Sequence, residues 1–470
     1  MSEEITLYAN DVKYIYNKDE FTLRMGIFFD GTGNDPTNKE SLSNIRKLFI
    51  KYPNNYDVAN NKSNITDKDN FPNIQSAYIR GVGSKNKSGV KDSFLGGGFG
   101  SGATERLEGI LFYIQSMIEI YKEKKGSLPE SIELDIFGFS RGAAMARHFV
   151  NILKQDNGSF YNIKYKYEAN NLKIRTLNLF DTVGSMGIAG NDIDIGFTYH
   201  IKSSYVSDAI THFIADDEYR YNFDGQFIGG NYIPYPIDKK IGKVSEYVLL
   251  GAHSDIGGGY KKEEHQVENN DLSKVYLHKM YDICIEVGIP FLEKPKTNAW
   301  KIPEDLNSYL DYFDAMYKDS KHKNLKIAHK KLREQQTYEN DKFKIADETY
   351  QYKEGIYKSL NEIFNDDTLC NEFIKKSNEF HDKYIHISYT SEVIKDDSVS
   401  LAQLSEVNLI NSIADIKDYI TMGSEEVGNK LQRTYFTPKY VDMRKSTDNA
   451  NLIEINEKYT ILSAIEFKDF

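Results

Sequence analysis

One serine lies in a setting that could make it a nucleophile. Ser140 stands between Gly138 and Gly142 in Phe-Gly-Phe-Ser-Arg-Gly, which fits the pattern G-x-S-x-G. In that pattern a strand turns sharply into a helix, and the glycines let both elements pack closely while the hydroxyl stays accessible. A purely structural role is also open, because serine is favoured at the first position of a helix. The pattern predicts that Ser140 is the nucleophile of a serine hydrolase.

A serine nucleophile needs an imidazole to take its proton and a carboxylate to hold that imidazole. In α/β-hydrolases these residues follow in the order serine, acid, histidine. Here Asp181 follows a predicted strand at 172–180 that alternates and then becomes apolar, and His253 follows an apolar run at 247–250. Among the ten histidines, only His253 combines a strand end with a glycine-rich loop. We therefore expect Ser140, Asp181 and His253 to form a catalytic triad.

The negatively charged oxygen of the reaction intermediate would need backbone N–H donors. We expect one donor from Arg141, directly after the serine, and one from a loop that follows the apolar run at 23–29. This loop consists of Asp30, Gly31, Thr32 and Gly33. The side chain of Asp30 could orient the loop, or it could pair with Arg141 or Arg147.

A divalent cation is a further possibility for Asp30, together with Asp255. Two separated carboxylates are weak evidence for such a site, because calcium and magnesium take six or more oxygen ligands. We therefore expect no metal.

Glycine is dense between residues 94 and 102. Gly98, Gly100 and Ala103 fit the pattern G-x-G-x-x-A of dinucleotide sites, but no apolar strand leads directly into them. We interpret the segment as a flexible loop near the active site and expect no cofactor. The candidates for an apolar entrance to the site are Phe94, Leu95 and Phe99.

The elements that must position these residues alternate between strand and helix. This alternation predicts an α/β-hydrolase-like fold, with a mostly parallel central sheet flanked by helices on both faces. Ligands bind such sheets at the carboxyl ends of the strands, where the candidate residues are expected. Apolar runs predict strands at 23–29, 76–83, 132–136, 172–180 and 247–250, and amphipathic spacing predicts helices at 41–52, 104–122, 143–150 and 272–288.

The chain divides by composition into three parts. We assign residues 1–290 to the catalytic core and 291–382 to a helical accessory region, which is rich in charged and aromatic residues at helical spacing. Residues 383–470 form a C-terminal segment that we expect to return to the core. Strand character begins there at 384–389, and a terminal hairpin is predicted at 459–467.

Charge and composition exclude some classes of partner. The formal net charge is −11 and the pI is about 5.5, so a general attraction to nucleic acid or anionic lipid is not expected. The N-terminus lacks the basic and apolar regions of a signal peptide, and no apolar run is long enough to span a membrane. We expect synthesis in the cytoplasm, with any export depending on a machine that reads no N-terminal signal.

Four motifs in the same order resemble the DUF2235 α/β-hydrolases, a family that includes the type VI secretion lipase effectors of the first class. They lie at 28–34, 138–147, 180–184 and 253–260. The resemblance implies a phospholipase that cleaves acyl esters of glycerophospholipids at a membrane surface. It also implies delivery by a secretion-machine component into the periplasm of a rival bacterium, and a cognate immunity protein. The nucleophile, acid and base of the family would be Ser140, Asp181 and His253.

Two other functions remain open. The hydrolase could act on a soluble ester or a cell-wall ester, since the triad alone does not define the substrate. The protein could also be a non-catalytic binding protein, because unrelated functions share the same scaffolds.

Overall fold

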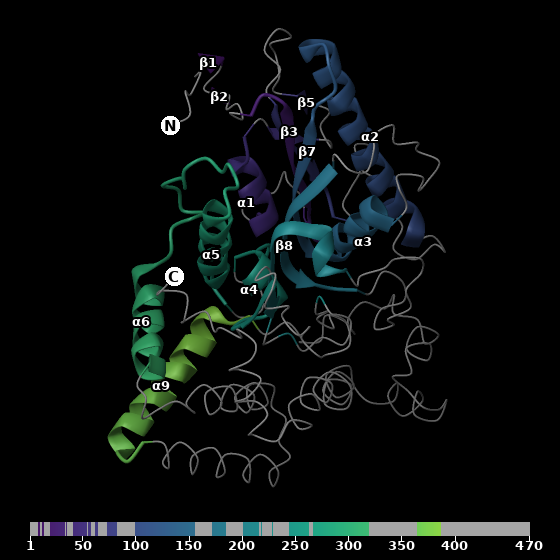
Figure 1. The fold of residues 1–470 in the computed structure, drawn as a ribbon. Coiled ribbons are helices and arrows are strands. Elements are labelled where there is room, and N and C mark those ends of the chain that lie inside the picture. Colours follow the sequence, from purple (N-terminus) through teal and green to yellow (C-terminus); the bar gives the residue numbers. More distant parts are fainter. Residues whose placement is uncertain are drawn as a thin grey trace, which may run out of the picture.

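The computed structural model of the 470-residue chain is shown in Figure 1. It describes residues 8–9, 12–13, 19–32, 34, 41–53, 55–57, 62–63, 73–81, 99–155, 172–184, 201–215, 218, 228, 244–262, 267–318 and 364–386. Among these residues, no helix is both long enough and apolar enough to cross a membrane. The hairpin predicted at 459–467 lies outside them.

A central sheet of eight strands has the order β10-β9-β8-β7-β3-β6-β4-β5. Every neighbouring pair is parallel except β4 with β5. The mostly parallel sheet predicted from the sequence is therefore confirmed. The strands are β3 (Thr22–Phe29), β4 (Asn55–Asp57), β5 (Lys62–Ser63), β6 (Ile74–Ile79), β7 (Ser131–Ser140), β8 (Leu172–Thr182), β9 (Val206–Ala215) and β10 (Val244–Leu249), and a separate antiparallel pair is formed by β1 (Tyr8–Ala9) and β2 (Val12–Lys13).

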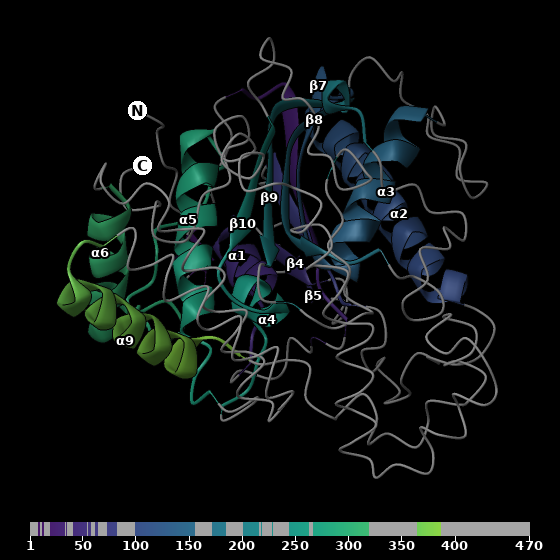
Figure 2. The same ribbon diagram turned by 90° about the horizontal axis from the view of Figure 1, so that it is seen from below.

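Helices cover both faces of the sheet (Figures 1 and 2). The helices α2 and α3 share one buried hydrophobic cluster with the sheet, and α1 and α5 share the other. Successive residues of β3 point to opposite clusters, with Phe28 on the α1 side and Phe29 on the α3 side. This explains why the central strands are continuously apolar. The helices are α1 (Asn44–Lys51), α2 (Phe99–Lys125), α3 (Arg141–Gln155), α4 (His253–Gly257), α5 (Leu272–Glu286), α6 (Glu304–Lys318) and α9 (Asp367–Tyr384).

The accessory helices α6 and α9 pack against each other through aromatic side chains. The ring of Phe313 in α6 lies 5.9 Å from Phe373 and 5.5 Å from Phe380, both in α9. These residues belong to the same buried cluster as α1 and α5. The same cluster contains two buried free cysteines, Cys284 of α5 and Cys370 of α9.

Two expectations differ from the structure. Tyr384, expected to begin a strand, is the last residue of α9, and Ile385 and His386 follow it without regular secondary structure. The glycine-rich loop expected after residue 250 contains the short helix α4. β9 was not expected at all.

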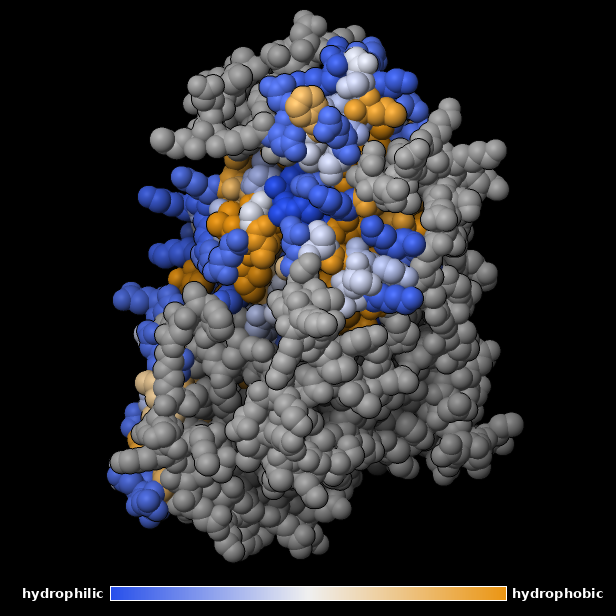
Figure 3. Space-filling model, in the orientation of Figure 1, coloured by the Kyte–Doolittle hydropathy of each residue, from blue (hydrophilic) through white to orange (hydrophobic). Residues whose placement is uncertain are grey.

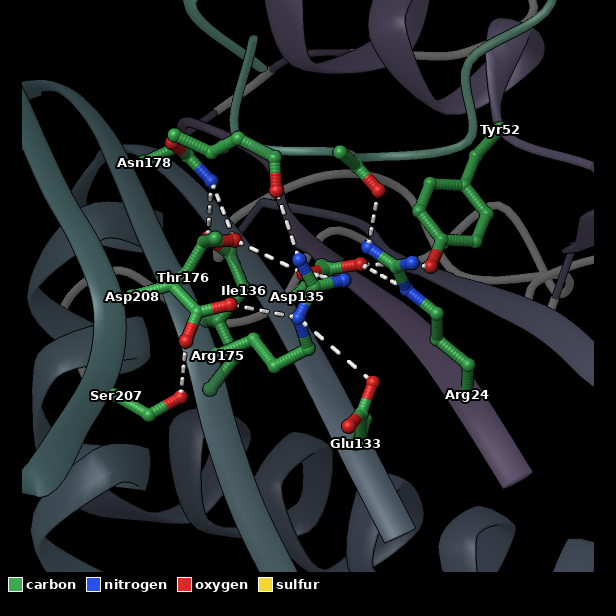
Figure 4. A network of polar contacts seen from close by, with 12 residues as sticks. Arg24, Tyr52, Glu133, Asp135, Ile136, Arg175, Thr176, Asn178, Ser207 and Asp208 are labelled. Atoms are coloured by element: carbon green, nitrogen blue, oxygen red, sulfur yellow. Dashed lines mark hydrogen bonds and ion pairs between the residues drawn. The ribbon is translucent and has the colours of Figure 1, made fainter. Parts of the chain in front are cut away.

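A polar network crosses the middle of the sheet (Figure 4). Asp135 of β7 is fully buried and accepts hydrogen bonds from Arg24 Nε at 2.9 Å and Tyr52 OH at 3.0 Å. Burial raises the pKa of Asp135, and the charge of Arg24 opposes that shift. Arg24 and Arg175 also donate to the carbonyls of Gly288 and Val287, at 2.8 Å each. The network therefore joins three neighbouring strands to the end of α5.

The visible face of the described surface is mixed in character (Figure 3). Hydrophilic side chains cover much of it, and the hydrophobic side chains gather in several separate areas. The large hydrophobic residues that are exposed, among those described, are Phe21, Ile50, Phe112, Leu128 and Ile285.

Candidate active site

Ser140 lies at the turn from β7 into α3, with no residue between the two elements. Its φ angle is 58°, in the left-handed region that residues other than glycine rarely adopt. Within the described part of the chain, the one other non-glycine residue with positive φ is Asp181, at 35°. Such conformations cost about 1–3 kcal/mol each and gather at functional sites. Two residues predicted from motifs thus share a strained backbone at adjacent strand ends.

Steric contacts explain why glycine lies on both sides of Ser140. A Cβ atom on Gly138 would lie 2.5 Å from Ala143 Cα in the following helix. One on Gly142 would lie 2.4 Å from the carbonyl oxygen of Asp30. The first glycine therefore permits the tight turn into α3, and the second permits α3 to begin against the end of β3.

Asp181 and His253 form a buried hydrogen bond of 2.6 Å between Oδ2 and Nδ1. The other carboxylate oxygen, Oδ1, accepts from the N–H of Ala215 at 2.9 Å, which fixes the orientation of the acid. A neutral His253 must carry its proton on Nδ1 to make this bond, because an ionised carboxylate only accepts. Its Nε2 is then an acceptor, as a general base requires.

The ring of His253 lies beside the end of β7. It stacks on Phe139, the residue before Ser140, with 4.6 Å between ring centroids and 29° between planes. Gly257 contacts the same phenylalanine, and a Cβ atom there would lie 2.0 Å from the ring. The structure thus brings together the segments that carry Ser140, Asp181 and His253.

Residues without a motif hydrogen-bond to His253 and to the strand end that carries Asp181. Its backbone N–H donates to Glu218 Oε2 at 3.2 Å, and Glu218 is fully buried. His212, on the strand next to Asp181, has Nε2 3.0 Å from Thr182 Oγ1 and Nδ1 2.9 Å from Glu246. Sequence reasoning missed these residues because none lies in a glycine-rich turn or a recognisable pattern.

Asp30 orients its own loop. Its buried carboxylate accepts four hydrogen bonds, and neither Arg141 nor Arg147 pairs with it. Burial raises the pKa of Asp30, while these hydrogen bonds lower it. The donors are Gly31 N at 2.7 Å, Asn34 Nδ2 at 3.0 Å, Ser43 Oγ at 2.6 Å and Tyr78 OH at 2.5 Å.

One of the oxyanion donors expected from the loop already has an acceptor in the structure. The N–H of Gly31 is directed to Asp30, and Gly33 lies outside the described residues. Thr32 remains, and its hydroxyl is buried without a hydrogen-bond partner among the described residues. Arg141 begins α3, and burial lowers its pKa to about 10, so it stays charged at neutral pH.

The remaining candidates are placed in different ways. Phe94 and Leu95 lie outside the described residues, and Phe99 is the first residue of α2. Ala103 also lies in α2, so the dinucleotide-like pattern runs into the helix. Asp255, considered above as a cation ligand, is hydrogen-bonded to His386, with 2.5 Å between Oδ1 and Nδ1. Within the described ranges, no group of three or more acidic, histidine or cysteine residues could hold a metal ion.

The parallel sheet, the strained serine at its turn and the acid–histidine pair define an α/β-hydrolase-like protein. The family model "T6SS, Phospholipase effector Tle1-like, catalytic domain" matches residues 24–158 and 154–283, more than half of the chain. The chain therefore belongs to this family of type VI secretion phospholipase effectors, as the motifs indicated, and is a lipolytic hydrolase. A search of curated proteins finds no match.

Two solved structures are similar. One is the Tle1 effector bound to the VgrG spike from the type VI secretion system, at 21% identity over 61% of this chain and 77% of that chain, with a TM-score of 0.41. The other is an uncharacterized protein from Pseudomonas aeruginosa, at 18% identity over 84% of this chain and 63% of that chain, with a TM-score of 0.48.

Proposed function

We propose that the protein is a phospholipase A-type serine hydrolase that cleaves acyl esters of glycerophospholipids through Ser140, Asp181 and His253. The observation that carries the proposal is the buried Asp181–His253 hydrogen bond, with the His253 ring stacked on the residue before Ser140. Membership of a phospholipase effector family supports the lipid substrate.

In the first half of the reaction, Ser140 Oγ attacks the ester carbonyl carbon while His253 Nε2 takes the hydroxyl proton. Asp181 stabilises the imidazolium that forms. The N–H of Arg141 and a donor from Thr32 stabilise the tetrahedral oxyanion. The intermediate collapses to an acyl-enzyme, and the leaving lysophospholipid oxygen receives the proton from His253.

In the second half, water attacks the acyl-enzyme, with His253 again as the base. The ester bond to Ser140 breaks, a fatty acid leaves, and the serine recovers its proton. One water is consumed for each ester cleaved, so no cofactor is needed for the balance of the reaction.

The test compares wild type, Ser140→Ala and Ser116→Ala on intact phospholipid vesicles, with lipid products identified by mass spectrometry. Ser116 is the matched control, because its hydroxyl donates only to the helix carbonyl of Phe112. We expect equimolar lysophospholipid and fatty acid from wild type and Ser116→Ala, and none above background from Ser140→Ala. Hydrolysis by Ser140→Ala would contradict the proposal.

Soluble short-chain esters separate the lipid substrate from other esters. A lipase that acts at a membrane should hydrolyse vesicle lipid faster than a monomeric ester of equal concentration. If wild type and Ser116→Ala cleave only the soluble ester, the proposed phospholipid substrate is wrong. That result would not contradict the proposed catalytic triad.

We further propose that the enzyme attacks a rival bacterium from the periplasm, is carried there by a spike protein of the secretion system, and is neutralised at home by an immunity protein. Family membership supports the effector role. Expression directed to the periplasm of a test bacterium should be toxic, whereas cytoplasmic expression and periplasmic Ser140→Ala should not. Toxicity that persists with Ser140→Ala would overturn the link to hydrolysis.

A further inference from the structure

A second acid–histidine pair has its acid, Asp255, on α4, the helix that also carries His253. Asp255 Oδ1 is 2.5 Å from His386 Nδ1, and the backbone N–H of His386 donates to Asp255 Oδ2 at 2.9 Å. Both side chains are fully buried. The pair joins residues 131 positions apart in the chain, because His386 follows the accessory helix α9.

The acid of this pair also accepts a hydrogen bond from the residue at the start of α4. Asp255 Oδ2 also accepts the N–H of Ala252 at 3.0 Å, and Ala252 directly precedes His253. The ring of His386 also stacks on Tyr260, three residues after the end of α4, with 4.3 Å between ring centroids and 29° between planes. His386 therefore contacts α4 itself through Asp255 and the chain after α4 through Tyr260.

The helix α4 needs such external contacts. It has five residues, and Ala252 at its N-cap has no side-chain oxygen to cap it. A single helical turn is not stable by itself, since too few hydrogen bonds offset the ordering of its backbone. The direction of the His253 ring toward Asp181 must then depend on the groups that fix α4 in place.

The accessory helices fix His386 in turn. Tyr384, two residues earlier, donates from its hydroxyl to Asp305 Oδ2 of α6 at 2.5 Å, and Lys383 pairs with the same carboxylate. The rings of Tyr309 in α6 and Tyr384 in α9 lie 6.0 Å apart. These residues lie beyond 283, where the match to the catalytic-domain family ends.

We propose that His386 is a positioning residue for the reaction: its hydrogen bond to Asp255 sets α4 so that His253 can act on Ser140. The inference rests on the proposed serine mechanism and assigns part of the site to the accessory helices. His386 does not transfer the proton itself, since its Nδ1 is committed to Asp255 and its Nε2 is buried without a partner among the described residues.

The test uses the full chain and a matched pair of substitutions. In His386→Asn the side-chain amide N–H takes the position of Nδ1 and can still donate to Asp255. In His386→Gln the amide reaches toward the position of Nε2 and leaves Asp255 without that donor. His386→Ala removes the side chain entirely, and His253→Asn removes the proposed base.

Three measurements are made on each variant: kcat and KM on vesicles, the rate at which a fluorophosphonate labels Ser140, and the pH profile of kcat/KM. We expect His386→Gln and His386→Ala to lower kcat and the labelling rate by about 10- to 100-fold with KM nearly unchanged, because an ångström-scale displacement of a catalytic group has such an effect. His386→Asn should recover most of both rates and keep the acidic limb of the wild-type pH profile.

Two results would overturn the inference. If His386→Gln keeps wild-type kcat and labelling while its melting temperature falls, His386 is only structural. If His386→Asn is as inactive as His253→Asn, His386 transfers a proton. The comparison of His386→Asn with His386→Gln tests the positioning role of His386 even if His386→Ala does not fold. Hydrolysis by Ser140→Ala would instead reject the serine mechanism, independently of every His386 variant.

Discussion

At the scale of single residues, the site depends on two strained positions and one short hydrogen bond. Ser140 and Asp181 both have positive φ, and Asp181 is 2.6 Å from His253. Motifs predicted the identity of all three residues, because a G-x-S-x-G turn and a glycine-rich loop leave a local signal. Glu218 lies in no such pattern, and its contact with His253 forms only when distant segments fold together.

Asp181→Asn should lower kcat on vesicles by about 10³- to 10⁴-fold, because the amide can hold His253 in the wrong tautomer and cannot stabilise the imidazolium. Fluorophosphonate labelling of Ser140 should slow in parallel. Asp282→Asn is the control, since Asp282 is exposed and its salt bridge is to Lys294. Undiminished labelling of Asp181→Asn would show that Asp181 is not the acid of the triad.

At the scale of elements, the apolar strands and long helices were predictable, whereas β9 and α4 were not. β9 carries Thr211 and His212 in buried positions, so polar residues interrupt its apolar pattern. The sequence could not show that His212 finds partners in Thr182 and Glu246 on neighbouring strands. The helix α4 lies in a glycine-rich stretch, and its stability comes from tertiary contacts instead of from its own residues.

The helix α1 gives a prediction about pH. Lys47 is buried, and burial lowers its pKa from 10.5 to about 8. The unfolded chain thus binds the proton more tightly, so the folded state carries a penalty that is full below pH 8 and disappears as the pH rises to 10.5. Lys47→Met should therefore raise the free energy of unfolding at pH 7 by up to about 3 kcal/mol.

The measurement is the thermal midpoint of wild type and Lys47→Met at pH 7 and at pH 10. The advantage of Lys47→Met should shrink at the higher pH. Lys125→Met, on a partly exposed lysine at the end of α2, should change the midpoint little at either pH. A lower midpoint for Lys47→Met at pH 7 would mean that the buried ammonium is net stabilising.

At the scale of the whole molecule, the two faces of the sheet have different partners. The α2–α3 face is closed by helices near in sequence, whereas the hydrophobic cluster on the opposite face includes α1 and α5 and extends to α6 and α9. The composition of 303–382 predicted helices there and gave no indication of where they pack. The His386–Asp255 hydrogen bond, which follows α9, joins positions 131 apart in the chain. Local periodicity does not encode contacts of this kind.

The network around Asp135 should set the stability of this assembly. Asp135→Asn removes the buried charge that faces Arg24 and Arg175, so we expect a loss of about 3–5 kcal/mol, as for breaking a buried ion pair. Chemical denaturation would measure it. Lys125→Ala, which removes an exposed pair with Glu20, should cost at most about 1 kcal/mol. An equal effect of both substitutions would contradict the role of the network.

The burial of the two cysteines decides whether they can be oxidised when the protein enters an oxidising compartment. Burial raises the pKa of both Cys284 and Cys370, so both thiols stay protonated inside the folded protein. Thiol exchange requires an accessible thiolate. In an oxidising periplasm, the folded enzyme would therefore keep both cysteines reduced, while a chain that arrives unfolded would expose them to disulfide formation. The redox state of Cys370 on α9 would record whether the accessory helices had folded before the protein met the oxidant.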